Sequence, residues 1–173
     1  MSAERSLRWG HEPDATVSRR PIDPLVGIDR LLVDGTNLLH AMRQSPGAAP
    51  AAALIGRLRA AVPPSIGIEL VFDGPPDPGL RGQRIASGLI VRHSGRRTGD
   101  DLLRSVVDDA RAVGAANAAR ILVVTDDAFL RSTIHARGGT TIGSKWLIHR
   151  LDRPRLSAPS VGNRRPPSDG RVG

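Results

Sequence analysis

Short continuous apolar runs and longer amphipathic stretches follow one another along the middle of the chain. Runs without internal alternation are typical of strands buried on both faces. The sequence predicts such strands at 28–33, 68–72, 89–91, 121–124 and 140–142. It predicts helices at 36–43, 50–61, 101–113, 128–137 and 144–151, the last with Ser144 as its N-cap. This order predicts an α/β domain with a central, mostly parallel sheet flanked by helices.

The two ends of the 173-residue chain lack this pattern. Residues 1–27 are polar, with prolines at positions 13, 21 and 24, and predict a flexible N-terminal arm. From residue 152 the chain is rich in Pro, Ser, Gly and Arg, which predicts a disordered basic tail because such a composition cannot bury a core. One folded domain is therefore expected over 28–151.

Aspartates stand where the predicted strands end. Asp34 ends the first strand and Asp73 the second, Asp126 and Asp127 follow a later strand, and Asp100 and Asp101 open the helix after the third. The carboxyl ends of parallel strands lie at one edge of a sheet, and ligands bind in the crevice beyond that edge. The sequence therefore brings six carboxylates to one place.

Two explanations compete for these acids. Asp is a favoured N-cap, which accounts for one of Asp100 and Asp101 and one of Asp126 and Asp127, but poorly for Asp73, because GPPDPG follows it. Neighbouring carboxylates repel each other, and a divalent cation between them offsets this repulsion. The set as a whole therefore favours a metal site. With oxygen ligands and no cysteine, the expected ion is Mg²⁺ or Mn²⁺.

The residues after Asp34 leave two interpretations open. The amide of Asn37 either holds a metal-bound water or a phosphate, or caps the following helix together with Thr36. Gly35 predicts a tight turn in which the backbone makes a close approach.

Charge points to a polyanionic partner. Lys and Arg number 25 against 17 acids, a net charge of +8, and Lys145 is the sole lysine. Arginine suits phosphate because its planar fork donates two parallel hydrogen bonds, although a codon bias toward Arg explains the charge equally well. Candidate phosphate ligands flank the acids: Arg81, Arg84, Arg92, Arg96, Arg97 and Lys145. For Lys145, an ordinary surface position is the simpler alternative.

Several classes of protein are disfavoured. The chain has no P-loop motif, which argues against nucleoside triphosphate hydrolysis. It has no tyrosine and only 2% aromatic residues, which argues against an aromatic platform for stacking bases. No membrane span or signal peptide is recognisable, so no membrane partner and a cytoplasmic location are expected.

Five motifs together resemble one family. LLVDGTN, VFDG, RTGDDLL, VVTDDAFL and GGTTIGSKWL, over about 28–151, resemble the YacP-like NYN domain family within the PIN-like nuclease superfamily. The resemblance implies a PIN-like three-layer fold and a ribonuclease, most simply an endonuclease, that depends on Mg²⁺ or Mn²⁺. Residue by residue, it implies a catalytic set of Asp34, Asn37, Asp73, Asp100 and Asp127, with Asp34 as the metal ligand on the first strand.

The sequence departs from the family pattern at three positions. Thr36 stands where an aromatic residue is common, Gly99 replaces Ala, and Asp126 replaces Ser, which leaves open whether Asp126 or Asp127 faces the metal and whether one ion or two are held. The implied partner is RNA, either messenger RNA or ribosome-associated RNA, and a homodimer is compatible with the family. Two alternatives stay open: a non-catalytic RNA-binding or ribosome-associated module, and a metal-dependent phosphoesterase acting on DNA or a small phosphorylated molecule.

Overall fold

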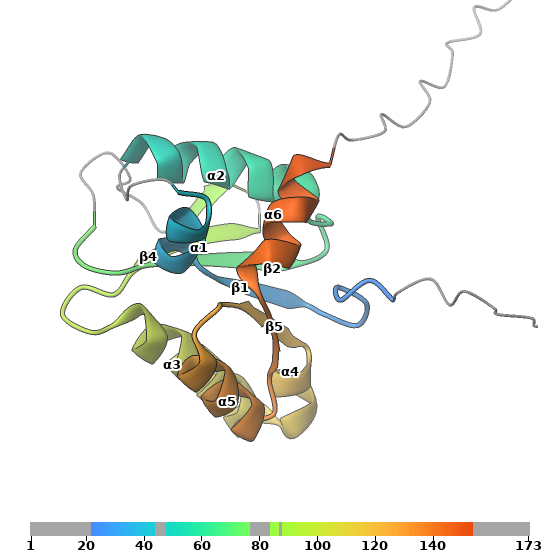
Figure 1. Cartoon of the computed structure of the whole chain (residues 1–173). Helices are drawn as coiled ribbons and strands as arrows, with labels where there is room; N and C mark the ends of the chain where they lie inside the picture. The colour runs from blue at the N-terminus through green and yellow to red at the C-terminus, as the bar shows by residue number, and fades with distance from the viewer. Residues whose placement is uncertain (1–21, 44–47, 77–83, 87, 154–173) are drawn as a thin grey trace, which may run out of the picture.

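The computed structural model describes residues 22–43, 48–76, 84–86 and 88–153, and these form a sheet with helices on both faces (Figure 1). The strands are β1 (Arg30–Asp34), β2 (Gly67–Phe72), β3 (Arg84–Ala86), β4 (Leu89–His93), β5 (Ile121–Val124) and β6 (Thr140–Ile142). The helices are α1 (Gly35–Ala41), α2 (Ala48–Ala61), α3 (Gly99–Val113), α4 (Ala115–Ala119), α5 (Ala128–Ala136) and α6 (Ser144–Asp152).

The sheet has the strand order β3-β4-β2-β1-β5-β6. β3 pairs antiparallel with β4, and the other neighbours are parallel. The apolar strand β1 lies at the centre, where Leu32 is in register with Glu69 on β2 and Val123 on β5. The predicted α/β class and mostly parallel sheet are therefore confirmed.

Successive side chains of a strand point to opposite faces, and each face has its own apolar core. Leu31 and Val33 join the core under α1, α2 and α6, whereas Leu32 joins the core under α3, α4 and α5. Figure 1 shows the three layers, with the first group of helices above the sheet and the second below it. Every parallel strand runs toward the same edge, where α1 and α3 begin.

Three sequence expectations need correction. Leu25 falls in the expected N-terminal arm but is only 6% exposed, because it packs into the core beside β1. Gly143, not Ser144, is the N-cap of α6, and the Ser144 amide donates to Asp126 Oδ1 at 3.0 Å. Arg84, which falls outside every strand and helix that the sequence predicts, lies in β3. The other parts of the arm and tail, residues 1–21 and 154–173, lie outside the described residues.

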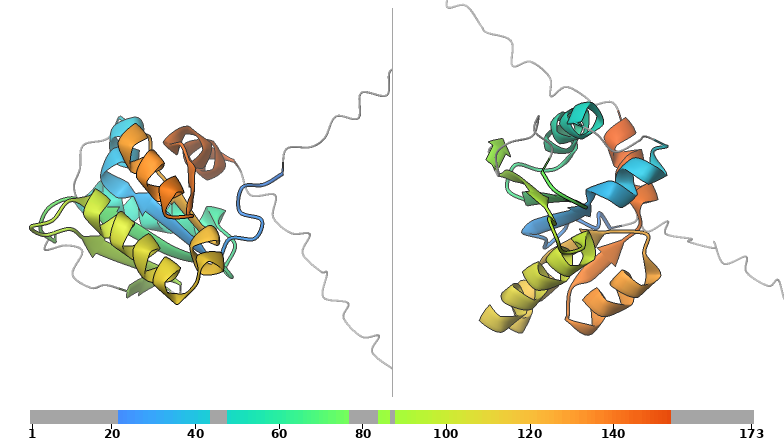
Figure 2. Two further views of the ribbon diagram at one scale, coloured as in Figure 1. Left: turned by 90° about the horizontal axis from the view of Figure 1, so that it is seen from below. Right: turned by 90° about the vertical axis from the view of Figure 1, so that its left-hand side faces the viewer.

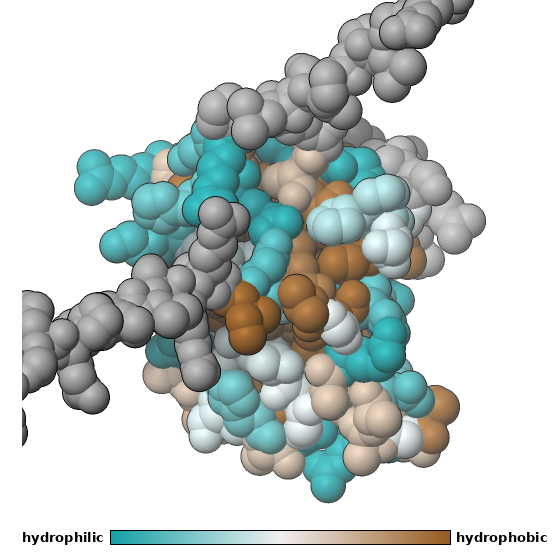
Figure 3. All heavy atoms as spheres, turned by 90° about the vertical axis from the view of Figure 1, so that its right-hand side faces the viewer, coloured by the Kyte–Doolittle hydropathy of each residue, from teal (hydrophilic) through white to brown (hydrophobic). Residues whose placement is uncertain are grey.

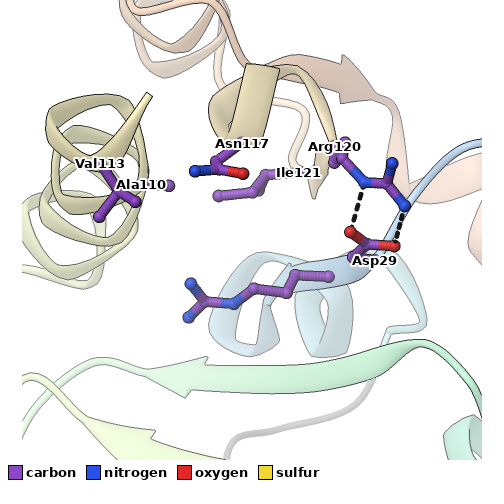
Figure 4. Close-up of a pocket in the computed structure, with 7 residues that line it drawn as sticks. Asp29, Ala110, Val113, Asn117, Arg120 and Ile121 are labelled. Atoms are coloured by element: carbon purple, nitrogen blue, oxygen red, sulfur yellow. Dashed lines mark hydrogen bonds and ion pairs between the residues drawn. The ribbon is translucent and has the colours of Figure 1, made fainter. Parts of the chain in front are cut away.

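The opposite, amino edge of the sheet is held by an ion pair. Arg120, just before β5, binds Asp29, just before β1, through both carboxylate oxygens, beside a shallow pocket that also includes Val113 and Asn117 (Figure 4). Figure 3 views this side of the molecule, where apolar side chains gather in the middle of the face. The pocket beside Asp29 and Arg120 therefore lies at the amino ends of the strands, at the opposite edge of the sheet from the predicted acidic site. Within the described residues, no helix has the length and apolarity needed to cross a membrane.

Candidate active site

Four aspartates interact electrostatically at the carboxyl edge of the sheet. Asp34 ends β1, Asp73 follows β2, Asp100 lies in the first turn of α3, and Asp127 is the N-cap of α5. The charges of Asp73 and Asp100 each raise the pKa of Asp34, and the charge of Asp127 raises that of Asp100. The structure therefore brings together four of the predicted acids, one from each motif.

Asp34 has the most strongly perturbed pKa in this cluster. Its pKa is raised from 3.8 to about 6, first by burial and then by the charges of Asp100 and Asp73, while hydrogen bonds from Asn37 oppose the shift. Its Oδ1 accepts from the Asn37 backbone N–H at 3.0 Å, which makes Asp34 the N-cap of α1. The capping of α1 that the sequence allowed to Asn37 and Thr36 is thus performed by Asp34.

Asp100 shares this electrostatic environment. Burial raises its pKa, as do the charges of Asp127, Asp73 and Asp101, while Arg104 opposes them. A carboxylate that is half-buried among like charges gains from a nearby cation, because the cation compensates both the lost hydration and the repulsion.

Asp73 and Thr36 join α1, β2 and α3 at the site. The Asp73 backbone N–H donates to Thr36 Oγ1 at 2.9 Å, and Asp73 Oδ1 accepts from the Gly99 N–H at 2.7 Å. A Cβ at Gly99 would lie 3.1 Å from that same Oδ1, so the glycine found there lets α3 begin close to the acid. This contact explains the acid at position 73, which does not cap the next element along the chain.

A buried hydroxyl, Thr125, connects two of the candidates. Thr125 is fully buried, and its Oγ1 accepts from the Asp127 backbone N–H at 3.2 Å and from the Asn37 side-chain amide at 3.4 Å. Asn37 therefore links Asp34, at the end of β1, to Thr125, just after β5. Sequence reasoning gave Thr125 no role, although a threonine between a buried strand and two acids was a visible signal.

Asp101 and Asp126 have other contacts. Asp101 forms a capping box with Thr98, pairs with Arg104 at 2.8 Å, and has a pKa lowered by its Thr98 hydrogen bonds. Asp126 uses Oδ1 to hold the start of α6, 3.0 Å from the Ser144 nitrogen. Asp101 therefore holds the start of α3 and Asp126 the start of α6. Asp127 also caps a helix, α5, but its charge acts on Asp100, so Asp100 and Asp127 are the members of the cluster.

The candidate basic residues are less concentrated than the acids. Arg96 and Arg97 are exposed in the turn before α3, Arg92 is half-buried on β4, and Lys145 is exposed on α6. Arg81 and the side chain of Arg84 lie outside the described residues. Phe129, two residues after Asp127, is 70% exposed and is a single exposed aromatic side chain close to the acids in the sequence.

A metal site is supported by charge rather than by ready coordination. The donors are hard oxygens, and the raised pKa values of Asp34 and Asp100 fit a site that a cation would stabilise. Within the described residues, however, no three His, Cys, Asp or Glu side chains are grouped so that they could hold an ion. Binding would therefore require the carboxylates to rotate toward one another.

The fold and this cluster define an α/β domain with an acidic site at the carboxyl edge of a parallel sheet. Among solved structures, the chain is similar to Rae1 (YacP) from Bacillus subtilis, with 22% identity and a TM-score of 0.56 over 72% of this chain and 74% of that one. A point mutant of Rae1 matches with 20% identity and a TM-score of 0.55, over 72% and 75%. No protein-family model matches the sequence, and no curated protein matches it. At this identity the similarity confirms the expected YacP-like resemblance at the level of the fold.

The neighbouring acids Asp126 and Asp127 differ in their contacts, because Asp126 holds the start of α6 whereas the charge of Asp127 acts on Asp100. We expect Asp127→Asn to reduce any activity of the cluster strongly, because it removes a charge beside Asp100. Asp126→Asn should leave that activity near the wild-type level and change the free energy of unfolding by at most about 1 kcal/mol, because Asn also caps helices. RNA cleavage assays and urea unfolding of both variants check this, and equal loss of activity in the two would contradict it.

Proposed function

We propose that this protein is a metal-dependent ribonuclease that hydrolyses RNA phosphodiester bonds, most simply as an endonuclease. The observation that carries the proposal is the electrostatic interaction of the four aspartates at an edge where burial, together with the charges of Asp100 and Asp73, raises the pKa of Asp34 to about 6. Structures do not usually gather like charges at a half-buried edge unless the charges bind or transform something. The similarity in fold to Rae1 (YacP) supports the same proposal.

In this proposal Asp34, Asp100 and Asp127 hold Mg²⁺ or Mn²⁺. When bound, the ion would neutralise phosphate charge and lower the pKa of a water molecule, which is the chemistry that hydrolysis needs. Asp73 positions the start of α3, and with it Asp100, through its 2.7 Å bond to the Gly99 nitrogen. Asn37, held by Asp34 and Thr125, places an amide beside the reacting groups.

The surroundings of the cluster support RNA as the substrate. Arg96 and Arg97 are exposed just before Asp100, where guanidinium groups bind phosphates on either side of the reacting one. An extended polyanion uses such flanking charges, whereas a small phosphorylated molecule does not need them. RNA binding should weaken steeply as salt rises.

One observation favours a second function, that of a non-catalytic RNA-binding module. The described residues contain no ready group of three metal ligands. A binding module would keep the basic residues and bind RNA equally well with EDTA, and substitutions in the acidic cluster would leave its affinity for RNA intact.

A pair of neighbouring variants tests the proposal. Purified protein is incubated with a labelled, mostly single-stranded RNA in Mn²⁺, Mg²⁺ or EDTA. We expect cleavage only with the metals, a loss of at least about 100-fold in Asp100→Asn, and near wild-type cleavage in Asp101→Asn, whose carboxylate serves the cap of α3. RNA binding without cleavage in any of these conditions would overturn the nuclease and leave the binding module.

A further inference from the structure

A second polar feature lies on the sheet face beside α3, away from the acidic cluster. Glu69 on β2 is only 4% exposed, although it stands within the apolar run IELVF. Its Oε1 binds Arg30 on β1, and its Oε2 lies 2.8 Å from Arg92 Nε on β4. Neither Oε2 nor that Nε has a hydrogen bond among the described residues, so the second contact is ionic only.

This triad is open to solvent through its arginines. The side chains of Arg30 and Arg92 are 38% and 41% exposed, whereas that of Glu69 is 6% exposed. Two guanidinium groups on one carboxylate leave one net positive charge at the surface. Glu69 thus fixes the stems of two arginines whose charged ends still face water.

The triad lines a shallow groove, here called the β2–β4 groove, formed by Arg30, Gly67, Glu69, Gly88, Ile90 and Arg92. α3 packs over Leu32 and Val71 and leaves this part of the sheet beside it. Figure 2, left, shows α3 crossing this face with the strands at the β4 edge of the sheet lying alongside. A Cβ at Gly67 would meet nothing closer than 3.7 Å, so there is open space at this position of the groove.

The groove leads toward the acidic cluster. Arg92 is paired in register with Val71, two residues before Asp73, so its backbone lies about 7 Å along the strand from that acid. Arg30 lies four residues before Asp34 on the adjacent strand, about 13 Å from the same edge. Both arginines therefore lie on the same side of the cluster, back along the strands from the carboxyl edge. Their distances from the cluster suit successive parts of a single strand of nucleic acid.

We propose that the β2–β4 groove binds the phosphate backbone of the RNA strand next to the bond at the acidic cluster, with Arg92 and Arg30 as its ligands. This assignment builds on the proposed ribonuclease function and names where its substrate lies. Arginine forks held by a buried carboxylate lose little conformational freedom on binding phosphate, which favours affinity. Base identity has no part in these contacts, so the groove positions RNA without selecting a sequence.

Binding without cleavage tests the groove separately from the nuclease. The affinity of a fluorescein-labelled single-stranded RNA is measured by anisotropy in EDTA over a range of salt concentrations. Each lost phosphate contact on a single strand lowers the salt slope by about 0.7, which is about fivefold in affinity at 0.1 M salt. We expect that effect from Arg92→Gln and from Arg30→Gln.

Arg57→Gln is the matched control, because Arg57 is also 38% exposed and pairs with a carboxylate, Asp152. It should change neither the affinity nor the slope. Since loss of an arginine beside buried Glu69 also weakens the fold, Ile90→Glu and Ile90→Lys, which leave the triad intact, should weaken and tighten binding respectively. If both Arg92→Gln and Ile90→Glu bind RNA as well as Arg57→Gln does, the proposed role of the β2–β4 groove is wrong, whatever the cleavage assay shows.

Discussion

Replacing Asp34 with asparagine will abolish RNA cleavage and at the same time make the protein more stable. The loss of activity, at least about 1,000-fold, follows because Asp34 is the proposed metal ligand on β1. The gain in stability follows because the carboxylate is half-buried beside Asp73 and Asp100, an environment that disfavours its charge. Asparagine keeps the oxygen that accepts from the Asn37 N–H and removes that charge.

The dependence of the effect on pH has a definite sign. The pKa of Asp34 is raised in the folded state, from 3.8 to about 6, so the folded protein binds this proton more readily than the unfolded chain. The contribution of Asp34 to the free energy of unfolding should therefore rise as pH falls from 8 through 6 toward 4, by up to about 3 kcal/mol. Asp34→Asn should lack that gain and should already be more stable at pH 8.

Urea unfolding of both proteins at pH 5 and pH 8, in EDTA, measures the difference directly. Asp101→Asn provides a control of opposite sign: hydrogen bonds from Thr98 lower the pKa of Asp101, so its contribution is present at neutral pH and is lost in acid. If the stability of the wild type and of Asp34→Asn changes with pH in the same way, Asp34 is not the group whose charge destabilises the folded protein.

The membership of the acidic cluster could be predicted largely from the sequence because the fold itself brings strand ends together. An apolar run such as β5, with every residue buried, specifies a central parallel strand, and the topology then fixes where the residue after it lies. Asp34, Asp73, Asp100 and Asp127 needed no knowledge of side-chain contacts to be grouped. The same logic could not separate Asp126 from Asp127, because both follow β5 directly.

The elements and contacts that the sequence did not indicate are short or formed across the chain. α4 has five residues, AANAA, and β3 has three, too few to show a period. Asp126 caps a helix that starts 18 residues later, which explains why Ser144 was wrongly expected to cap α6. Glu69 interrupts an apolar strand in the sequence, and only the pairing of β1, β2 and β4 shows its two arginine partners.

Gly35→Ala should damage both the stability and the site, although Gly35 has no functional group. A Cβ at this position would lie 2.6 Å from the Phe72 ring and 2.9 Å from the Val71 carbonyl oxygen, both closer than packed atoms allow. The Phe72 ring could turn away, but the Val71 carbonyl oxygen is part of the β2 backbone and cannot. We expect a loss of about 1–3 kcal/mol in the free energy of unfolding, with α1 displaced from the sheet.

That displacement would reach the candidate catalytic residues, since Asp34 directly precedes Gly35 and Asn37 follows two residues later. Cleavage should therefore fall by more than the lost stability explains, and it should stay low when the assay is run well below the melting temperature. Gly56→Ala is the matched control: Gly56 is an exposed position of α2 with no atom within 4 Å of a new Cβ, and alanine there should stabilise the helix by up to about 1 kcal/mol.

A double variant identifies the contact responsible. Phe72→Leu removes the ring that an alanine at position 35 would meet, but it leaves the Val71 oxygen in place. If the ring dominates, the pair Gly35→Ala and Phe72→Leu will be more stable than the sum of the single changes predicts. If the two changes are simply additive, the close approach of α1 to the β2 backbone is what requires glycine, and the position of Asp34 depends on that backbone contact.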